Sequence, residues 1–431
     1  MVVCAAVWSI ALSAQADDFA AKRLVNWHQW RGPDATGVAP HGDPPINWDE
    51  KTHIKWKTAI PGTGLSTPVI WGDRIFSLTA LKTDRQPKTK ASEGKAPQSN
   101  HQFLILCLDR RTGGILWQRL PCEAVPHEGH AGTSSYANAS PVTDGRYVYA
   151  SFGSRGIYSY DMEGVQQWKA DLGKFSIKYA FGEGSSPALY QDTLIVNCDH
   201  EQQSFITALD ARTGKPKWRV PRDEKSTWNT PLVTEHKGQI LVLVNGANRA
   251  RSYDLANGEL IWQYGEKPGV DAIPSPMRIN DLAIFISGLR GDPVYAVPLG
   301  SSGDLSSTDR LAWRHARGGS QISSAVLLGS RLFFIRGRTG VLTCLDARNG
   351  AVIIDQQRLP ALNEIYASAV ATAGRVYFTS RNGVTVVLDA TANEVRILAE
   401  NHLDATISAS PAIVGREIFI RGEKNLYCIA H

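Results

Sequence analysis

One short pattern recurs along the chain and limits its fold more than any other feature. In its clearest copy a strand-like stretch ends at Asp210, a turn follows as far as Gly214, and a second strand-like stretch carries Trp218. The Asp210 carboxylate can accept hydrogen bonds from backbone N–H groups of the turn, and Gly214 can adopt a positive φ without steric cost. A tryptophan side chain brings a large apolar surface that another part of the fold must cover. Each copy therefore predicts two antiparallel strands joined by a tight turn.

Further copies keep the order of aspartate, glycine and tryptophan. The matching residues are Asp109, Gly113 and Trp117 in one copy, and Asp254, Gly258 and Trp262 in another. Trp168, Trp218 and Trp262 recur at intervals of about 45 to 50 residues, and this period is typical of propeller blades.

A second pattern precedes these turns: a small polar residue, usually followed by proline, opens a short apolar strand. Its eight copies are 66–69, 139–142, 185–188, 229–232, 274–277, 323–326, 367–370 and 409–412. Proline at the start of a strand removes no essential hydrogen-bond donor, so its position fits the entry to a strand. The two patterns together predict units of four short antiparallel strands. We therefore expect an all-β fold, an eight-bladed β-propeller.

The repeats at the two ends of the chain are each incomplete, and each supplies the strand that the other lacks. The last unit ends at His431 without a fourth strand, whereas Trp56 lies in a strand-like stretch that has no unit before it. We expect the N-terminal strand to pair with the C-terminal strand, because such closure leaves only short, protected edges.

These boundaries divide the chain into three segments. Residues 1–16 have an apolar run followed by Ala14-x-Ala16, which is typical of a secretory signal peptide. Residues 17–50 form an N-terminal arm, whose aromatic side chains we expect on the rim of the propeller, and residues 51–431 form one eight-bladed propeller. We expect an exported monomer that works in the periplasm, in the cell envelope or outside the cell.

Composition narrows the classes of partner. The chain has 46 basic and 41 acidic residues, a net charge of +5, and the two signs are interleaved, so we expect no nucleic-acid partner. No stretch after the signal peptide approaches the roughly 20 apolar residues of a transmembrane helix. Cys122 and Cys198 lie outside the repeat positions, and they could form a disulfide or remain free thiols.

The repeats resemble the pyrroloquinoline-quinone-like (PQQ-like) propeller repeat, with its tryptophan-docking motif Ala-x-Asp-x-x-Thr-Gly-x-x-x-Trp. Asp210, Thr213, Gly214 and Trp218 match this motif best, and the resemblance covers roughly residues 50–431. It implies that the tryptophan of each blade packs between blades. The arm segment 30–33, Trp-Arg-Gly-Pro, also resembles exported propellers of planctomycete-type bacteria.

The resemblance implies one of two functional branches. Quinoprotein dehydrogenases of this family bind PQQ with Ca²⁺ and oxidise alcohols or sugars. BamB-like members have eight blades and no cofactor, and serve as scaffolds in outer-membrane protein assembly. The size of the chain and its lack of an adjacent cysteine pair favour the second branch. We predict a non-catalytic, BamB-like scaffold for a protein partner, with no cofactor. The alternatives are a PQQ- and Ca²⁺-dependent dehydrogenase and a carbohydrate- or polymer-binding module.

Residues just before the inner strands are predicted to lie near one mouth of the central channel. The candidates are Tyr136, Asn138, Glu183, Trp228, Asn229, Gln321 and Tyr366. They either bind a ligand or simply complete the polar wall of the channel. Glu183 would be a catalytic base or a Ca²⁺ ligand only in a dehydrogenase. His127 and His130 could share a metal ion on a helix, but Pro126 indicates a loop, so we predict no metal site.

Overall fold

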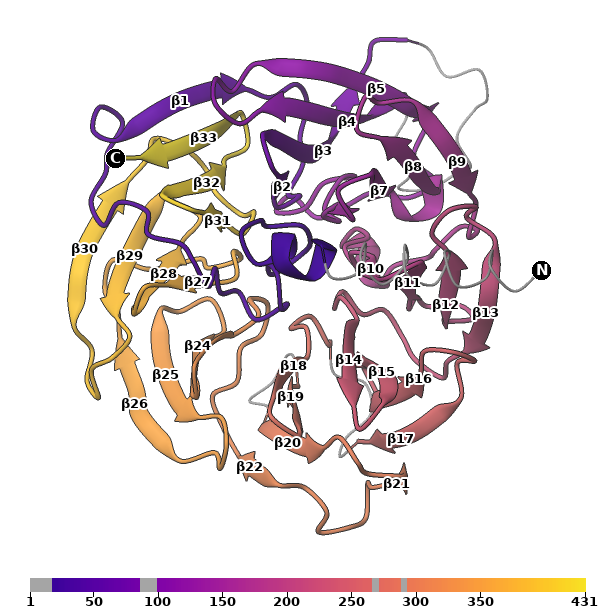
Figure 1. Ribbon diagram of the computed structural model, residues 1–431, viewed down its shortest axis with the longest axis vertical. Helices are drawn as coiled ribbons and strands as arrows, with labels where there is room; N and C mark the ends of the chain where they lie inside the picture. Colours follow the sequence, from indigo (N-terminus) through magenta and orange to yellow (C-terminus); the bar gives the residue numbers. More distant parts are fainter. Residues whose placement is uncertain (1–17, 86–98, 266–270, 288–292) are drawn as a thin grey trace, which may run out of the picture.

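Each repeated unit folds into one blade of a ring of eight (Figure 1). The structure is a computed structural model that describes residues 18–85, 99–265, 271–287 and 293–431. Each inner strand begins at the last residue of one of the eight proline-type patterns. The predicted eight-bladed, all-β propeller is therefore confirmed. The predicted signal peptide, residues 1–16, lies outside the described residues.

The first four blades follow one another in chain order, and within each the strands run in sequence from the innermost to the outermost. Blade 1 consists of β2 (Val69–Trp71), β3 (Arg74–Lys82), β4 (His101–Asp109) and β5 (Ile115–Ala124). Blade 2 consists of β6 (Val142–Thr143), β7 (Tyr147–Ser151), β8 (Ile157–Asp161) and β9 (Gln166–Ala170). Blade 3 consists of β10 (Ala188–Tyr190), β11 (Thr193–Cys198), β12 (Phe205–Asp210) and β13 (Pro216–Pro221). Blade 4 consists of β14 (Leu232–His236), β15 (Gln239–Val244), β16 (Ala250–Asp254) and β17 (Leu260–Tyr264).

The remaining blades continue around the ring in the same direction. Blade 5 consists of β18 (Met277–Ile279), β19 (Leu282–Ile286), β20 (Val294–Pro298) and β22 (Trp313–His315). Blade 6 consists of β23 (Val326–Leu328), β24 (Arg331–Arg336), β25 (Val341–Asp346) and β26 (Val352–Arg358). Blade 7 consists of β27 (Val370–Thr372), β28 (Arg375–Thr379), β29 (Val384–Asp389) and β30 (Ile397–His402). Blade 8 consists of β31 (Ala412–Val414), β32 (Glu417–Arg421), β33 (Asn425–Ala430) and β1 (Ile54–Ala59).

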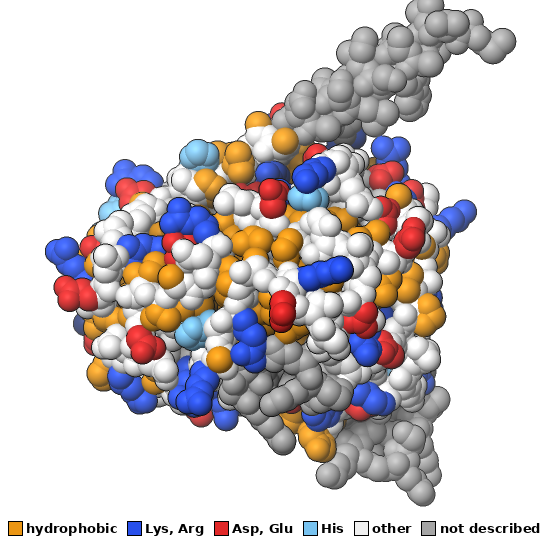
Figure 2. Space-filling view, turned by 90° about the horizontal axis from the view of Figure 1, so that it is seen from below, with side chains coloured by type: hydrophobic (Ala, Val, Ile, Leu, Met, Phe, Trp, Pro, Cys, Tyr) orange, Lys and Arg blue, Asp and Glu red, His pale blue; other side chains and the backbone are white. Residues whose placement is uncertain are grey.

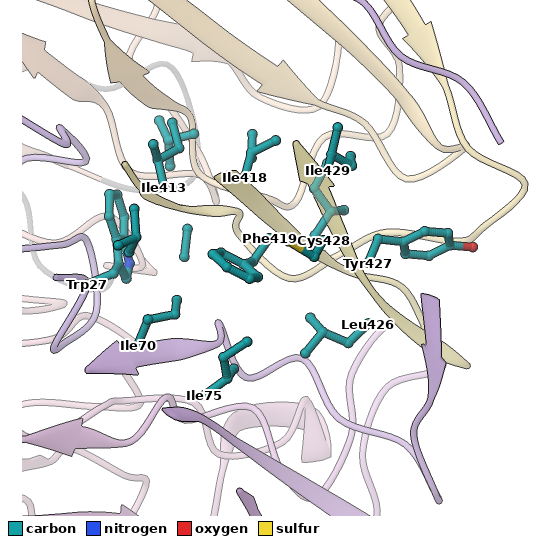
Figure 3. Close-up of a cluster of buried hydrophobic side chains, with 14 of the residues drawn as sticks. Trp27, Ile70, Ile75, Ile413, Ile418, Phe419, Leu426, Tyr427, Cys428 and Ile429 are labelled. Carbon is teal, nitrogen blue, oxygen red and sulfur yellow. The ribbon is translucent and has the colours of Figure 1, made fainter. Parts of the chain in front are cut away.

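The ring closes through the two ends of the chain, as the sequence predicts. β1 is the outer strand of blade 8 and pairs antiparallel with β33, where Trp56 lies opposite Cys428. Figure 3 shows the apolar core at this junction, to which Ile75 of blade 1 and Phe419 of blade 8 contribute. Closure therefore combines strand pairing with burial of a continuous hydrophobic cluster.

A belt of hydrogen bonds joins the inner ends of the blades. The hydroxyl oxygen of Ser140 accepts a hydrogen bond from the backbone N–H of Thr67 in the preceding blade, and Ser186 accepts one in turn from the N–H of Ser140. Five further bonds of the same kind, all between 2.8 and 3.2 Å, pass through Thr230, Ser275, Ser324, Ser368 and Ser410. The hydroxyl residue in seven of the eight proline-type patterns is thus an acceptor between blades. Within the described residues the Thr67 hydroxyl itself has no partner.

Tryptophans join the outer parts of neighbouring blades. The indole N–H of Trp218 donates to the Leu255 carbonyl, 2.7 Å away in the next blade, and Trp168 donates in the same way to Ala211. Equivalent bonds link Trp56 to Arg110, Trp117 to Met162 and Trp313 to Ala347. In each case the acceptor is the residue that follows the aspartate of the repeated turn. The turn glycine lies against the indole: a Cβ on Gly214 would come within 2.5 Å of Trp168.

The junction between blades 4 and 5 differs because blade 5 lacks the repeated turn. An insertion at this point contributes β21 (Gly303–Asp304), which pairs in parallel with β17 of blade 4. Trp262 packs edge-on against Phe285, with ring centroids 5.9 Å apart. In the described part of the chain its indole N–H has no acceptor. The indole is therefore buried at this junction without its usual hydrogen bond.

The N-terminal arm crosses the middle of the ring (Figure 1), although its aromatics were expected on the rim. Trp27 forms a bridge with Ile70 of blade 1, and Val38 forms one with Ala371 of blade 7. The Arg31 guanidinium donates to carbonyls of Ala325 and Ala369, which precede the inner strands of blades 6 and 7. The inner strands leave apolar surface and free carbonyls around the axis, and the arm covers them.

The surface fits the expected mixture of charges. Figure 2 shows basic and acidic side chains scattered among one another on one side of the ring. None of the helices in the described part of the chain has the length and hydrophobicity that crossing a bilayer requires. Cys122 and Cys198 are free thiols in the structure, as are Cys107, Cys344 and Cys428.

The contact between glycine and indole predicts an unusually damaging alanine substitution. Gly214→Ala forces a positive φ of 70° on alanine and drives its Cβ into Trp168. Gly238→Ala is a matched control, because its φ is 81° but nothing lies within 4 Å of the added Cβ. The control carries only the strain of the left-handed backbone, about 1–2 kcal/mol. Urea denaturation should show Gly214→Ala to be about 1–3 kcal/mol less stable than the control; equal stabilities would contradict the proposed contact.

The hydroxyl belt predicts a second pair of variants. Ser186→Ala leaves the buried Ser140 N–H without its acceptor and should lower the free energy of unfolding by about 1–3 kcal/mol. Thr67→Val removes a hydroxyl without a partner in the described residues, so it should be neutral or stabilising. Thermal and urea unfolding of both variants provide the measurement. A large loss of stability in Thr67→Val would show that its hydroxyl has a role in closing the belt.

Candidate ligand-binding site

The strongest candidate site is a cavity of about 60 Å³ between blades 2 and 3. Its walls come from the connections 125–141 and 171–187, which precede the inner strands β6 and β10, and from η1 (Gly153–Arg155). The backbone of the arm bonds to the other ends of inner strands, at Thr143 and Gly415, whereas the Arg31 side chain reaches carbonyls at the starts of β23 and β27. The backbone of the arm and the cavity therefore lie at opposite faces of the ring.

A more open groove of about 580 Å³ lies between the turns of blades 3 and 4, and it makes a weaker candidate. It is lined by turn residues such as Lys237 and Gly238 and by the strand residues beside them. Its Lys217 ammonium already pairs with Asp192 at 2.8 Å. Nothing in this groove gathers titratable groups around a buried space, so we centre the site on the smaller cavity.

Glu183 is held in the cavity wall by a backbone hydrogen bond. Its Oε2 accepts from the Ser154 N–H at 2.7 Å. Gly153 makes this approach possible, because a Cβ there would lie only 1.5 Å from Oε2. Among the described residues Oε1 has no hydrogen-bond partner, which leaves it available to the cavity. The sequence candidate Glu183 is therefore a positioned carboxyl group with one open oxygen.

The partly buried setting of Glu183 changes its acidity. Desolvation raises the pKa of its carboxyl from 4.5 to about 7, although the hydrogen bonds from Ser154 oppose this shift. Burial also raises the pKa of Glu128, whose Oε1 accepts from the Ile177 N–H at 2.9 Å. Glu183 consequently exists in both protonation states near neutral pH.

His127 positions the guanidinium of Arg155 at the same cavity. Its Nε2 lies 2.6 Å from the Phe175 carbonyl, which can only accept, so this nitrogen carries the proton. Its Nδ1 then accepts from Arg155 Nη2 at 3.0 Å. The ring is therefore neutral, and burial lowers its pKa in agreement. His127 acts as a fixed acceptor that positions the Arg155 guanidinium.

Tyr136 and Asn138 complete this part of the wall. The Asn138 amide donates to the Glu183 carbonyl at 2.7 Å and accepts from the Ser135 hydroxyl at 2.7 Å, so its polar groups are engaged within the protein. The Tyr136 hydroxyl donates to the Glu128 carbonyl at 3.3 Å, and desolvation raises its pKa to about 12. Asn138 fixes the backbone beside Glu183, and Tyr136 contributes an aromatic surface.

The other sequence candidates are not gathered at this cavity. Trp228 adjoins it and donates to the Gly182 carbonyl at 2.6 Å, whereas Asn229 is buried and bonded to Asn245. Gln321 packs near Gly337, and the Tyr366 hydroxyl accepts from Arg338. Gln321 and Tyr366 therefore belong to the other side of the ring: Gln321 lies at blade 6, and Tyr366 lies between blades 6 and 7.

The residues that line this cavity do not fit a quinone with its calcium ion. By the same measure of volume one water needs roughly 10–15 Å³, so 60 Å³ takes a few atoms and excludes a fused-ring molecule. No three His, Cys, Asp or Glu side chains among the described residues are grouped to hold a metal ion. His127 has both ring nitrogens engaged, and His130 bonds the Ala131 carbonyl through Nδ1. The structure does not bring these two histidines into a metal site.

Arg155, Phe152 and Phe175 are the functional candidates that the sequence reasoning missed. That reasoning followed only the connections before the inner strands, whereas Phe152 and Arg155 lie in the loop between the second and third strands of blade 2. Both kinds of loop end at the same face of a propeller. The pair of glycines at 153 and 156 marks this tight loop in the sequence and could have indicated it.

The comparisons with known proteins agree with this architecture. The model of the family described as outer membrane protein assembly factor BamB matches residues 101–356, more than half of the chain. No curated protein matches the sequence. Many solved structures share the fold.

Three solved structures illustrate the likeness. BamB from Moraxella catarrhalis is 12% identical with a TM-score of 0.55, and the match covers 82% of this chain and 99% of that one. The quinohemoprotein alcohol dehydrogenase from Comamonas testosteroni is 12% identical with a TM-score of 0.65, covering 96% and 82%. A europium-containing methanol dehydrogenase is 10% identical with a TM-score of 0.67, covering 96% and 100%. At such identities these structures show a shared fold alone.

The raised pKa of Glu183 predicts how stability depends on pH. Between about pH 4.5 and 7 the folded state keeps a proton that the unfolded state has released, so stability falls as pH rises through this window. Glu183→Gln cannot titrate, and its stability should fall less between pH 5 and 8 than that of the wild type. Glu394→Gln, at an exposed position, should follow the wild type. Urea unfolding across this range measures the difference, and parallel curves for Glu183→Gln and wild type would contradict the assignment.

Proposed function

We propose that this chain, which belongs to the family of the outer membrane protein assembly factor BamB, is a non-catalytic scaffold that binds a protein partner. The proposal includes export by a signal peptide, action in the periplasm or cell envelope, and a monomeric state. Both scaffolds and dehydrogenases occur among the similar folds, so the choice between them rests on the site. The misfit of a quinone and Ca²⁺ to the cavity supports the scaffold.

An exposed aromatic ridge is the observation that carries the proposal. We use this name for Tyr179, Phe181 and Trp228, which lie beside the cavity. Tyr179 is 80% exposed and Phe181 is 42% exposed. The rings form a row, with centroids 5.7 Å apart between Tyr179 and Phe181 and 6.2 Å apart between Phe181 and Trp228. Aromatic side chains of this kind dominate the binding energy of protein interfaces.

The ridge is held in place rather than loosely displayed. Tyr179 and Ala180 both have a φ of 52°, a backbone conformation that costs of order 1–3 kcal/mol per residue. The Lys178 N–H donates to the Ser226 hydroxyl at 2.9 Å, and its ammonium pairs with Asp271 at 2.7 Å. Such bonds hold Tyr179 outward in a strained turn. A preorganised aromatic group loses little entropy when a partner binds.

Site-specific crosslinking tests this role. A photoreactive phenylalanine analogue at Phe181 should crosslink one protein of discrete mass in intact cell envelopes. Tyr179→Ala in the same protein should lower the yield at least fivefold, because removing an interface aromatic typically costs more than 1 kcal/mol. The same analogue at Val352, which is 48% exposed on the outer strand β26, is the matched control and should crosslink nothing above background.

Two results would overturn the scaffold. One is equal crosslinking from Phe181 and Val352. The other is stoichiometric binding of PQQ with Ca²⁺, followed by dye-linked oxidation of alcohols or sugars. In that case the dehydrogenase alternative would stand, and Glu183→Gln should abolish turnover.

A further inference from the structure

We propose that the cavity between blades 2 and 3 is a carboxylate-binding site, which takes a carboxylate attached to a short apolar group. This inference goes beyond the scaffold role and does not depend on it. The matching ligand chemistry is the free C-terminus of a peptide with an apolar last residue, or a small aliphatic acid. Arg155 would bind the carboxylate, and the floor of the cavity would take the apolar group.

Arg155 has no ion-pair partner among the described residues, although its charge lowers the pKa of the neighbouring Glu183 carboxyl. Within the same residues its one side-chain hydrogen bond goes to the neutral His127. This bond uses one of the two hydrogens on Nη2 and leaves the other, together with the N–H groups of Nε and Nη1, to a ligand. A guanidinium presents paired N–H groups that match the two oxygens of a carboxylate. The side chain is half-buried in the wall, where such a pair is stronger than in open solvent.

The floor beneath Arg155 is apolar and small. Phe152, Phe175, Ile177 and Val196 line it, and all four are buried. The volume of about 60 Å³ suits a carboxylate with a short side chain, such as that of valine. Lining residues such as His127 and Glu128 are partly exposed to solvent, so a longer ligand can continue outward.

Glu183 supplies a second contact to a carboxylate instead of repelling it. Glu183 lines the cavity, and its Oε2 already accepts from the Ser154 N–H, so a proton on this carboxyl belongs on Oε1. Protonated Glu183 can then donate to a ligand oxygen. With its pKa at about 7, this form is substantially populated at neutral pH.

The other charged groups around the cavity do not replace the ligand. Asp199 lines the space, but both of its oxygens are bound by Arg222 at 2.8 and 3.1 Å. Glu128 has a raised pKa and accepts from the Ile177 N–H. Lys174 approaches from the connection 171–187 and, like Arg155, disfavours a charge on His127. His130 faces the ring of Tyr136. Protonation of Glu183 is therefore the change that strengthens carboxylate binding as pH falls.

Calorimetric titration of the full chain tests the site with three probes. These are N-acetylvaline, N-acetylvalinamide and a pentapeptide that ends in a free valine. We expect saturable binding of both acids and at least a tenfold weaker affinity for the amide, in wild-type protein. Affinity for the acids should rise from pH 8 to pH 6. Because the amide control needs no mutation, the result does not depend on a variant's folding.

Two variants then identify the cation. Arg155→Gln should weaken both acids at least tenfold, whereas Arg146→Gln, an exposed arginine in the first turn of the same blade, should leave affinity unchanged. Both should show wild-type thermal unfolding midpoints within a few degrees. Tighter binding of the pentapeptide than of N-acetylvaline would show that the site binds peptide C-termini. Equal affinities would show that it binds small acids. Either result supports the proposed carboxylate-binding site. Equal binding of acid and amide, or no binding of either acid, would overturn the proposal.

Discussion

Backbone N–H groups that donate to hydroxyl oxygens of the next blade hold the centre of this protein together. A propeller has no single core, and each blade packs only on its neighbours. The apolar faces between blades could therefore slide without much change in buried area, because the hydrophobic effect is not directional. The belt through Ser140, Ser186 and their equivalents fixes the angle between blades, since a hydrogen bond weakens steeply when it is bent. The indoles fix the same angle farther out.

The belt also determines where functional groups can be placed. Each hydroxyl residue is immobilised just before an inner strand, so the connection that leads to it starts from a fixed end. The connections 125–141 and 171–187 are the longest of these, and they lie at adjacent junctions. Their extra residues lie outside the four-stranded blades, form much of the wall of the cavity and carry Tyr179 and Phe181 of the aromatic ridge. The segments that depart from the repeat are thus concentrated in one part of one face of the ring.

The features that recur in the blades could be predicted from the sequence, whereas contacts that occur only once could not. The blade number, the closure by Trp56 and the turn at Asp210 follow from patterns that recur, because every copy solves the same packing problem. Glu183 was found because it precedes an inner strand. Arg155 was missed since its importance depends on His127, a contact between residues 28 positions apart that no periodicity encodes. The histidine was noticed for metal chemistry, yet its neighbours make it a hydrogen-bond acceptor. The arm was misplaced for a similar reason: its partners are spread over several blades.

The position of the arm has a consequence for how such a ring can evolve. Repeats are readily duplicated or lost, and a ring of strands has no intrinsic reason to stop at one size. Trp27 meets blade 1, while Arg31 and Val38 reach blades 6 and 7, so one short non-repeating segment spans separations that only this circumference provides. Gain or loss of a blade would detach part of the segment and leave a buried guanidinium without acceptors. The contacts of the arm therefore fit only a ring of eight blades, and a chain with more or fewer blades would be less stable.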